Sequence, residues 1–174
     1  MNCKGQGRHK GNRNYYIDER DKELYIAFRN AKRYILETDG VVLLPKAADI
    51  ARHTTTSRYF VSERRASEVI KAMCKHIDDD RDYRGILGLK VLSKMRFQTK
   101  RMYANLYITY KNISYEYPNE THEELITRAC ACPAPEFFLS LKSTIIILNN
   151  IKRNKAINGK YTSDQMLIKK NKER

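Results

Sequence analysis

Long apolar runs are missing from this 174-residue sequence. The aliphatic run Ile145 to Leu148 falls far short of the roughly 20 residues that a membrane-spanning helix needs. The first fourteen residues, "MNCKGQGRHKGNRN", are followed by no apolar stretch, so they do not resemble a secretory signal. We therefore expect a protein that neither crosses nor enters a membrane.

Cysteine is also scarce, and the usual catalytic patterns are missing. The four cysteines, at positions 3, 74, 130 and 132, have the spacing of neither a disulfide framework nor a zinc site. We expect reduced thiols in a cytosol and no metal or other cofactor. There is no glycine-rich phosphate-binding pattern and no nucleophile elbow, and the acidic run at 78–82 is typical of a solvated segment. We therefore predict that the protein is not an enzyme.

Acidic residues are few beside the basic ones. The chain has 20 Asp and Glu against 34 Lys and Arg, a formal net charge of +14. This excess indicates an anionic partner, with nucleic acid first and an acidic protein or a membrane surface second. Basic residues gather in an N-terminal stretch (1–14), in the segment 83–115, which has seven and no acid, and near the C-terminus (152–172). Ribosomal and virion proteins share this composition, so charge alone does not choose among these classes.

Apolar residues recur with the period of an α-helix, and turn residues separate the helical stretches. The pattern predicts helices over 18–37, 45–53 and 63–77. Gly40 suits the left-handed position that ends the first helix, and Pro45 suits the first turn of the second. Ser62 is a good N-cap for the third. The inward face of the first helix comprises Leu24, Phe28, Ala31 and Ile35.

The sequence then repeats this pattern. "RYFVS" at 58–62 and "EFFLS" at 136–140 lie 78 positions apart, and adding 78 to the inward positions of the first half gives mostly apolar positions in the second, without a gap. Thr121 and Glu124 form the spacing of a capping box, and Ser140 is placed to cap a helix over 141–155. We therefore predict an all-α fold of two tandem three-helix units, 15–92 and 93–157. A basic segment links the units, and a flexible basic arm (1–14) and a lysine-rich tail (158–174) flank them.

A short helix, a turn and a capped helix resemble a helix-turn-helix, in which the last helix enters the major groove of DNA. The turn from Thr54 to Val61 is longer than the usual three or four residues, which leaves a packing module as the alternative. We expect the aromatic pairs of the two repeats to be core wedges, with one ring of each pair buried and the other free. The alternative is a single-strand platform, with Tyr59 or Phe137 stacked on bases. The candidate nucleic-acid-binding residues are Arg58, Arg64, Arg65, Lys71, Lys75, Lys94, Arg96, Lys100, Arg101, Lys142, Asn149, Lys152 and Arg153.

Two stretches, "KAADIARHTTTSRYFVSERRASEVIKAM" and "THEELITRACACPAPEFFLSLKSTIIILNNIKR", resemble a set of small uncharacterised proteins of Bacteroidota, their mobile elements and phages. Those proteins often have two blocks of the form PAP-R-F-Y-hydrophobic-S. The resemblance covers about residues 20–155. The second block here, "CPAPEFFLS", has Glu136 where Arg is usual, and the first, "TTTSRYFVS", lacks both prolines. The resemblance implies a duplication and a mobile-element setting, but no catalytic or binding residues.

Together these features predict a non-catalytic DNA-binding protein, regulatory or architectural, of a mobile element or phage. The arm, the linking segment and the tail would contact phosphates, and the last helix of a repeat would enter a groove of duplex DNA. The first alternative is a virion structural protein or a packaged component that binds other virion proteins. The second alternative is an RNA-binding protein. The expected location is the cytoplasm of the bacterial host or the virion.

Overall fold

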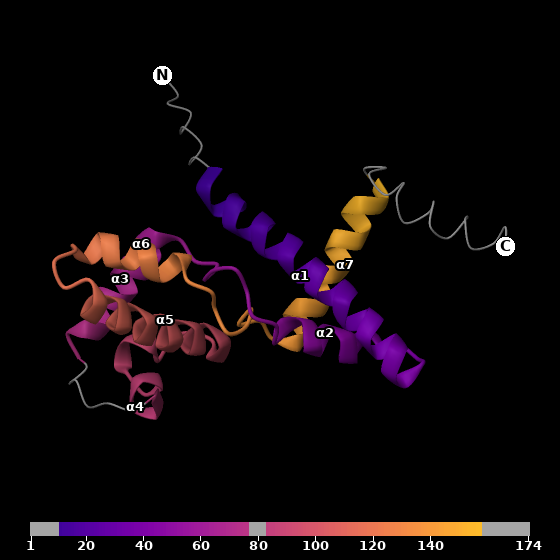
Figure 1. Cartoon of the computed structure of the whole chain (residues 1–174), viewed down its shortest axis with the longest axis horizontal. Helices are drawn as coiled ribbons and strands as arrows, with labels where there is room; N and C mark the ends of the chain where they lie inside the picture. The colour runs from indigo at the N-terminus through magenta and orange to yellow at the C-terminus, as the bar shows by residue number, and fades with distance from the viewer. Residues whose placement is uncertain (1–10, 77–82, 158–174) are drawn as a thin grey trace, which may run out of the picture.

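The computed structural model describes residues 11–76 and 83–157, and the regular elements in these ranges are all helices (Figure 1). The expected all-α fold is therefore confirmed. The bounds are α1 Gly11–Asp39, α2 Leu44–Arg52, α3 Glu63–Cys74, α4 Tyr83–Leu87, the 3-10 helix η1 Lys90–Leu92, α5 Phe97–Glu116, α6 His122–Ala131 and α7 Leu141–Ile157. Because α1 begins at Gly11, residues 11–14 belong to a helix and not to an arm, which corrects the prediction there. The rest of the expected arm (1–10), the acidic run 78–82 and the tail (158–174) lie outside the described residues.

Side chains at the helix ends explain where several of these helices begin and end. The hydroxyls of Ser62 and Ser140 each accept a hydrogen bond from the third backbone N–H of the helix that follows, at 3.4 Å and 3.1 Å. Thr121 and Glu124 form the predicted capping box at the start of α6. Gly40 ends α1 with φ +71°, a backbone conformation that favours glycine. These four local predictions from the sequence are confirmed.

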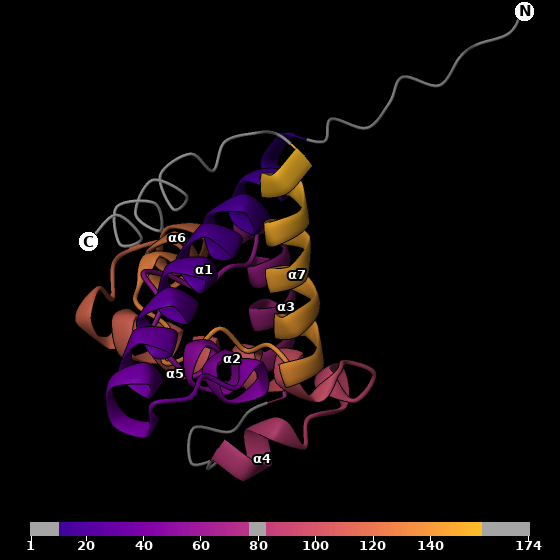
Figure 2. The ribbon, with the colours of Figure 1, turned by 90° about the vertical axis from the view of Figure 1, so that its right-hand side faces the viewer.

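The packing of the helices does not follow their order in the chain. α1 and α2 pack against α7, whereas α5 and α6 pack against α3, so each group takes its third helix from the other half of the chain (Figure 1). Figure 2 shows α1, α2 and α7 together on the side that faces the viewer. We call α1, α2 and α7 the first unit, and α3, α5 and α6 the second unit. The predicted units of three consecutive helices are therefore corrected: the last helices are exchanged.

Each unit has its own apolar core. The core of the first unit includes Leu24, Phe28, Ile35, Ala47, Ala51 and Leu148. The core of the second unit includes Ile70, Met73, Leu106, Ile126 and Ala129. The inward positions that the helical period predicts are thus largely the buried ones, although the partner helix differs from the one expected.

Two extended segments cross where the helices exchange, and they pair symmetrically. We call residues 53–62 the first hinge and residues 132–140 the second hinge. Thr56 and Ala134, 78 positions apart, exchange two backbone hydrogen bonds of 2.9 Å and 3.2 Å. The backbone N–H groups of Tyr59 and Phe137, also 78 apart, each donate to a carbonyl in the last turn of the opposite half's second helix, at 3.0 Å. Replacing each residue by its counterpart 78 positions away in the other half converts one of these two bonds into the other, as an approximate two-fold axis through the crossing requires.

The aromatic pairs of the hinges meet each other across this crossing. Tyr59 stacks on Phe138 with ring centroids 6.3 Å apart, and Phe60 stacks on Phe137 at 6.1 Å. Phe137 and Phe138 are both buried, as is Tyr59, and Phe60 is half-buried. The rings therefore belong to the core, but the expectation of one free ring in each pair is wrong. The reason is that the exchange gives each ring a partner from the other hinge.

The basic segment between the two repeats is also more ordered than the sequence suggests. α4 and η1 fold against the second unit, where Ile86, Leu89 and Leu92 join its core. The regular spacing of these three apolar residues in the sequence could have indicated this packing. The segment is therefore a part of the second unit, with its basic side chains on the outside.

Candidate nucleic-acid interface

The outward face of α7 combines basic, amide and apolar side chains without an acid. Residues at positions i, i+4, i+7 and i+11 fall on one side of a helix, opposite the buried Leu148. The exposed side chains on that side are Lys142, Ile146, Asn149 and Arg153, with Asn150 at the margin. Leu141–Ile157 has no Asp or Glu, and neither Lys142 nor Arg153 makes an ion pair within the described ranges.

A further lysine extends this basic surface from α7 to α1. The ammonium of Lys152 lies 5.5 Å from the ring centroid of Phe28, and that of Lys32 lies 5.9 Å from the same centroid. The two lysines come from α7 and α1, so the junction between these helices is basic. The sequence does not indicate Lys32, because this lysine lies beside Lys152 only as a result of the exchange of α7.

The corresponding face of α3 is different, because acids accompany its basic residues. Arg64 and Arg65 both pair with Glu68, at 3.4 Å and 3.0 Å, and Lys71 pairs with Glu123 of α6 at 3.8 Å. The hydrogen bond from Arg65 lowers the pKa of Glu68, which favours its ionised form. The positive charge of this predicted recognition helix is therefore largely compensated on its own surface.

A second uncompensated basic surface lies at the start of α5. Lys94 and Arg96 are exposed, Lys100 is half-buried, and none of the three makes an ion pair among the described residues; the same holds for exposed Lys75 at the end of α3. Two tyrosines of α5, Tyr103 and Tyr107, do not take part, since both are buried in the core.

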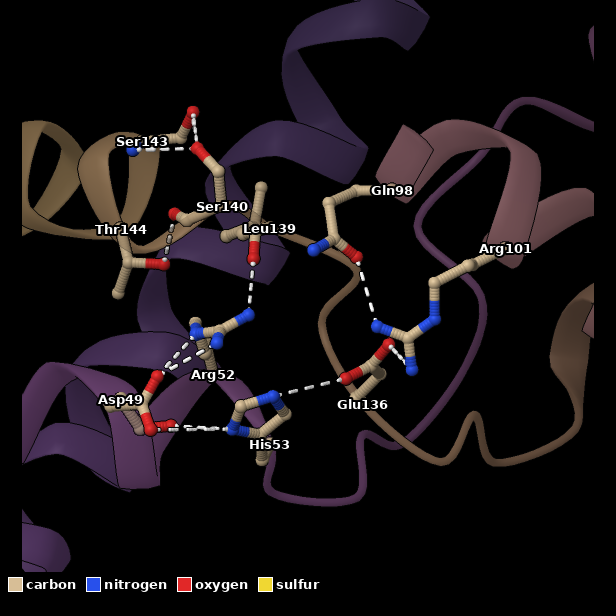
Figure 3. A network of polar contacts seen from close by, with 10 residues as sticks. All are labelled: Asp49, Arg52, His53, Gln98, Arg101, Glu136, Leu139, Ser140, Ser143 and Thr144. Atoms are coloured by element: carbon tan, nitrogen blue, oxygen red, sulfur yellow. Dashed lines mark hydrogen bonds and ion pairs between the residues drawn. The ribbon is translucent and has the colours of Figure 1, made fainter. Parts of the chain in front are cut away.

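Arg101, although close by in sequence, is committed to an internal network (Figure 3). Its guanidinium lies 2.8 Å from Oε1 of Glu136, whose side chain is only 8% exposed. Nε2 of His53 lies 3.6 Å from the other carboxylate oxygen, and Arg101 also donates to the amide oxygen of Gln98 at 3.2 Å. This network joins the first hinge, the second hinge and α5, so Arg101 has a structural role whatever else it binds.

Arg58 also faces inward. Its guanidinium stacks on the ring of Tyr16 at 4.7 Å, and its Nε is buried without a hydrogen-bond partner among the residues that the structure describes. It lines a cavity of about 220 Å³ between α1, α5 and the two hinges, together with Arg20 and Thr99. Arg58 is therefore not on either open basic surface.

The predicted residues thus divide among several places. Lys142, Asn149, Lys152 and Arg153 come together on α7, and Lys94, Arg96 and Lys100 come together at the start of α5.

In the ranges that the structure covers, no helix is long and apolar enough to cross a membrane, and no three His, Cys, Asp or Glu gather as a metal site requires. Comparison with protein-family models, with curated proteins and with solved structures finds no match for this chain.

Proposed function

We propose that the protein binds duplex DNA without catalysing a reaction, and that the outward face of α7 makes the main contact. The observation that carries this proposal is the acid-free face of Lys142, Asn149 and Arg153. Arginine can bond guanine through two donors, asparagine can bond adenine, and lysine neutralises phosphate. Ile146, at the centre of the face, suits contact with a thymine methyl group.

The packing of α7 supports this role. A recognition helix needs a rigid support behind it, and α7 has α2 and α1 packed on its inner side. In a helix-turn-helix the supporting helix directly precedes the recognition helix. Here α2 supports a helix from the other half of the chain, and the eight residues Thr54 to Val61 form the crossing instead of a compact turn. The resemblance to proteins of mobile elements and phages favours a regulatory or architectural role in that setting.

The charge distribution favours α7 over α3 as the groove-binding helix. Arg64, Arg65 and Lys71 would have to leave Glu68 and Glu123 to reach phosphates, and these carboxylates would then repel the DNA. Two matched double variants separate the helices. K142Q/R153Q and R64Q/K71Q each remove two exposed positive charges, from α7 and from α3.

The test is a salt-titrated anisotropy measurement with a labelled duplex of about 30 base pairs, from about 50 to 300 mM salt. We expect the unmodified protein to bind with a steep negative salt slope. K142Q/R153Q should weaken binding about tenfold and reduce the slope by about 2, because two phosphate contacts are lost. R64Q/K71Q should change both quantities much less. A flat salt slope, no duplex binding near physiological salt, or equal effects of the two variants would contradict the proposal.

A further inference from the structure

Phe97 is an apolar aromatic side chain that the fold leaves in solvent. It is the first residue of α5, and 64% of its surface is exposed. The guanidinium of Arg101, one turn further along the helix, lies 5.9 Å from its ring centroid. Neither apolar core includes the ring. One face of an aromatic ring is thus available at a fixed position on a rigid helix.

The surroundings of this ring are basic and contain no nearby acid in sequence. Lys94 and Arg96 precede it and are exposed, and Lys100 follows at i+3 on the same side of α5. The whole segment from Tyr83 to Tyr115 has no Asp or Glu. An exposed ring bordered by three uncompensated cations fits an anionic ligand that carries flat, apolar faces.

A groove lies beside Arg101, close to this ring. It has a volume of about 520 Å³, within the range of about 300–1,000 Å³ that is typical of small-ligand sites. Arg101 lines it and also borders Phe97, so one side chain connects the ring with the groove. His53, Tyr83 and Asn105 add two further rings and an amide, and the hydroxyl of Tyr83 accepts a hydrogen bond from Asn105 at 3.0 Å. The carboxylate of Glu136 is also in this groove, but Arg101 neutralises it.

We propose that the Phe97 ring, the cations beside it and this groove bind single-stranded nucleic acid, with one base stacked on Phe97. Stacking on an exposed ring needs an unpaired base, because the bases of a duplex already stack on each other. Lys94, Arg96 and Lys100 would contact the phosphates on either side of that base. The inference rests on the proposed binding of nucleic acid, but it assigns a second site, on the second unit, whose ligand is a single strand.

The chain has no tryptophan, so the variant F97W has a single fluorescent reporter at the site. We expect titration with an oligothymidylate of about 12 nucleotides to quench its emission strongly, since a stacked base quenches indole. Y115W is the matched control. Tyr115 is 71% exposed on the same helix and has the Lys111 ammonium 5.3 Å from its ring centroid, but it lies about 27 Å away along the helix axis. Its emission should change little.

Affinity provides the second measurement. F97A should bind the oligothymidylate about tenfold more weakly than the unmodified protein, whereas F97W should bind it at least as tightly. Neither change should affect binding of a blunt duplex. If duplex binding persists while F97W shows no quenching or F97A loses no affinity for the single strand, this inference fails and the proposed function stands. If neither nucleic acid binds, both fail.

Discussion

At the scale of single residues, the charges in the two hinges show how the repeats have diverged. Glu136 and Arg58 occupy positions 78 apart, so the same place in the two hinges has opposite charge. Glu136 bonds to Arg101 of α5, and the residue 78 before Arg101 is Glu23 of α1, which accepts a hydrogen bond from the backbone of Ser57 at 3.1 Å. The hinge of each half is thus held by the first helix of the same half, through side chains of different sign.

The contact of Glu136 should contribute measurably to stability. We expect E136Q to lower the free energy of unfolding by about 1–2 kcal/mol, because the variant leaves Arg101 without its partner carboxylate. The value is below that of a fully buried pair, since the Arg101 side chain is 30% exposed. Urea unfolding followed by circular dichroism measures it. As a control, E37Q, at an exposed position of α1, should change the free energy of unfolding by less than about 0.5 kcal/mol. An equally small effect of E136Q would show that the network does not stabilise the fold.

Cys130 offers a pH-dependent test of the second core. Burial, with a smaller contribution from the negative charge of Glu63, raises the pKa of its thiol from an ordinary value of 9.0 to about 12. The unfolded chain therefore releases this proton at lower pH than the folded one. The stability that the neutral thiol contributes is complete below pH 9 and is lost as the pH rises from 9 towards 12.

This difference in pKa predicts that the unmodified protein and C130A differ in free energy of unfolding by an amount that changes with pH. Between pH 8 and pH 10 the unmodified protein should lose about 1.4 kcal/mol relative to C130A, which lacks the thiol. Comparing the pair at each pH cancels the titration of the other groups. Alkylation of the native protein at pH 8 should modify exposed Cys74 well before Cys130. A gap that stays constant with pH, or equal alkylation of the two cysteines, would mean that Cys130 is not in a closed core.

At the scale of helices, the exchange of α3 and α7 determines which contacts a core substitution removes. Leu148 of α7 and Ile70 of α3 are both fully buried, in the first and second unit respectively. We expect L148A and I70A each to cost about 2–4 kcal/mol in the free energy of unfolding. Because the cavity weakens the unit around it, L148A should speed local hydrogen exchange in α1 and α2, and I70A should speed it in α5 and α6.

Hydrogen exchange followed by mass spectrometry separates these outcomes at short labelling times. The two variants serve as controls for each other, since each substitution creates a cavity in a different core. If L148A instead loosens α5 and α6, then α7 packs within its own half and the helices are not exchanged.

The helices themselves were largely predictable, but their partners were not. Ser62, Ser140 and Gly40 set helix ends through bonds within a few residues, so the sequence shows them directly. The period of the apolar residues shows which face of α7 is buried, but α3 has an equivalent stripe that fits the same kind of surface. What chooses between them is the path of the hinges, including the φ of +51° at Phe138, which no local pattern indicates.

The same limit applies to the candidate interface. The excess of positive charge and its location on α7 and at the start of α5 follow from the sequence. Whether a basic residue has an acidic neighbour does not, because Lys71 finds Glu123 and Arg101 finds Glu136 only through the fold. Phe97 was missed for a similar reason, since an apolar residue at the start of a helix is usually buried.

At the scale of the whole molecule, the exchange makes the first unit depend on the second. About 90 residues separate the end of α2 from the start of α7, and closing a loop of that length costs about 4 kcal/mol in chain entropy. When the second unit is folded, the paired hinges hold α7 beside α2, so folding of the first unit then requires little further loss of chain entropy. The first unit is therefore expected to be much less stable once the second unit unfolds.

Single-tryptophan variants test this coupling, because the chain supplies no tryptophan of its own. F97W reports on the second unit, and Y34W, at an exposed position of α1, reports on the first. In the chain, α3, α5 and α6 follow one another, whereas the second unit separates α1 and α2 from α7, so only the first unit needs the other unit to bring its helices together. The Y34W signal should therefore unfold in urea at a midpoint no higher than that of the F97W signal. Circular dichroism of each variant controls for any change in stability that the substitution itself causes. A Y34W midpoint above that of F97W would mean that the first unit is stable without the second and that the crossing of the hinges contributes little to holding it together.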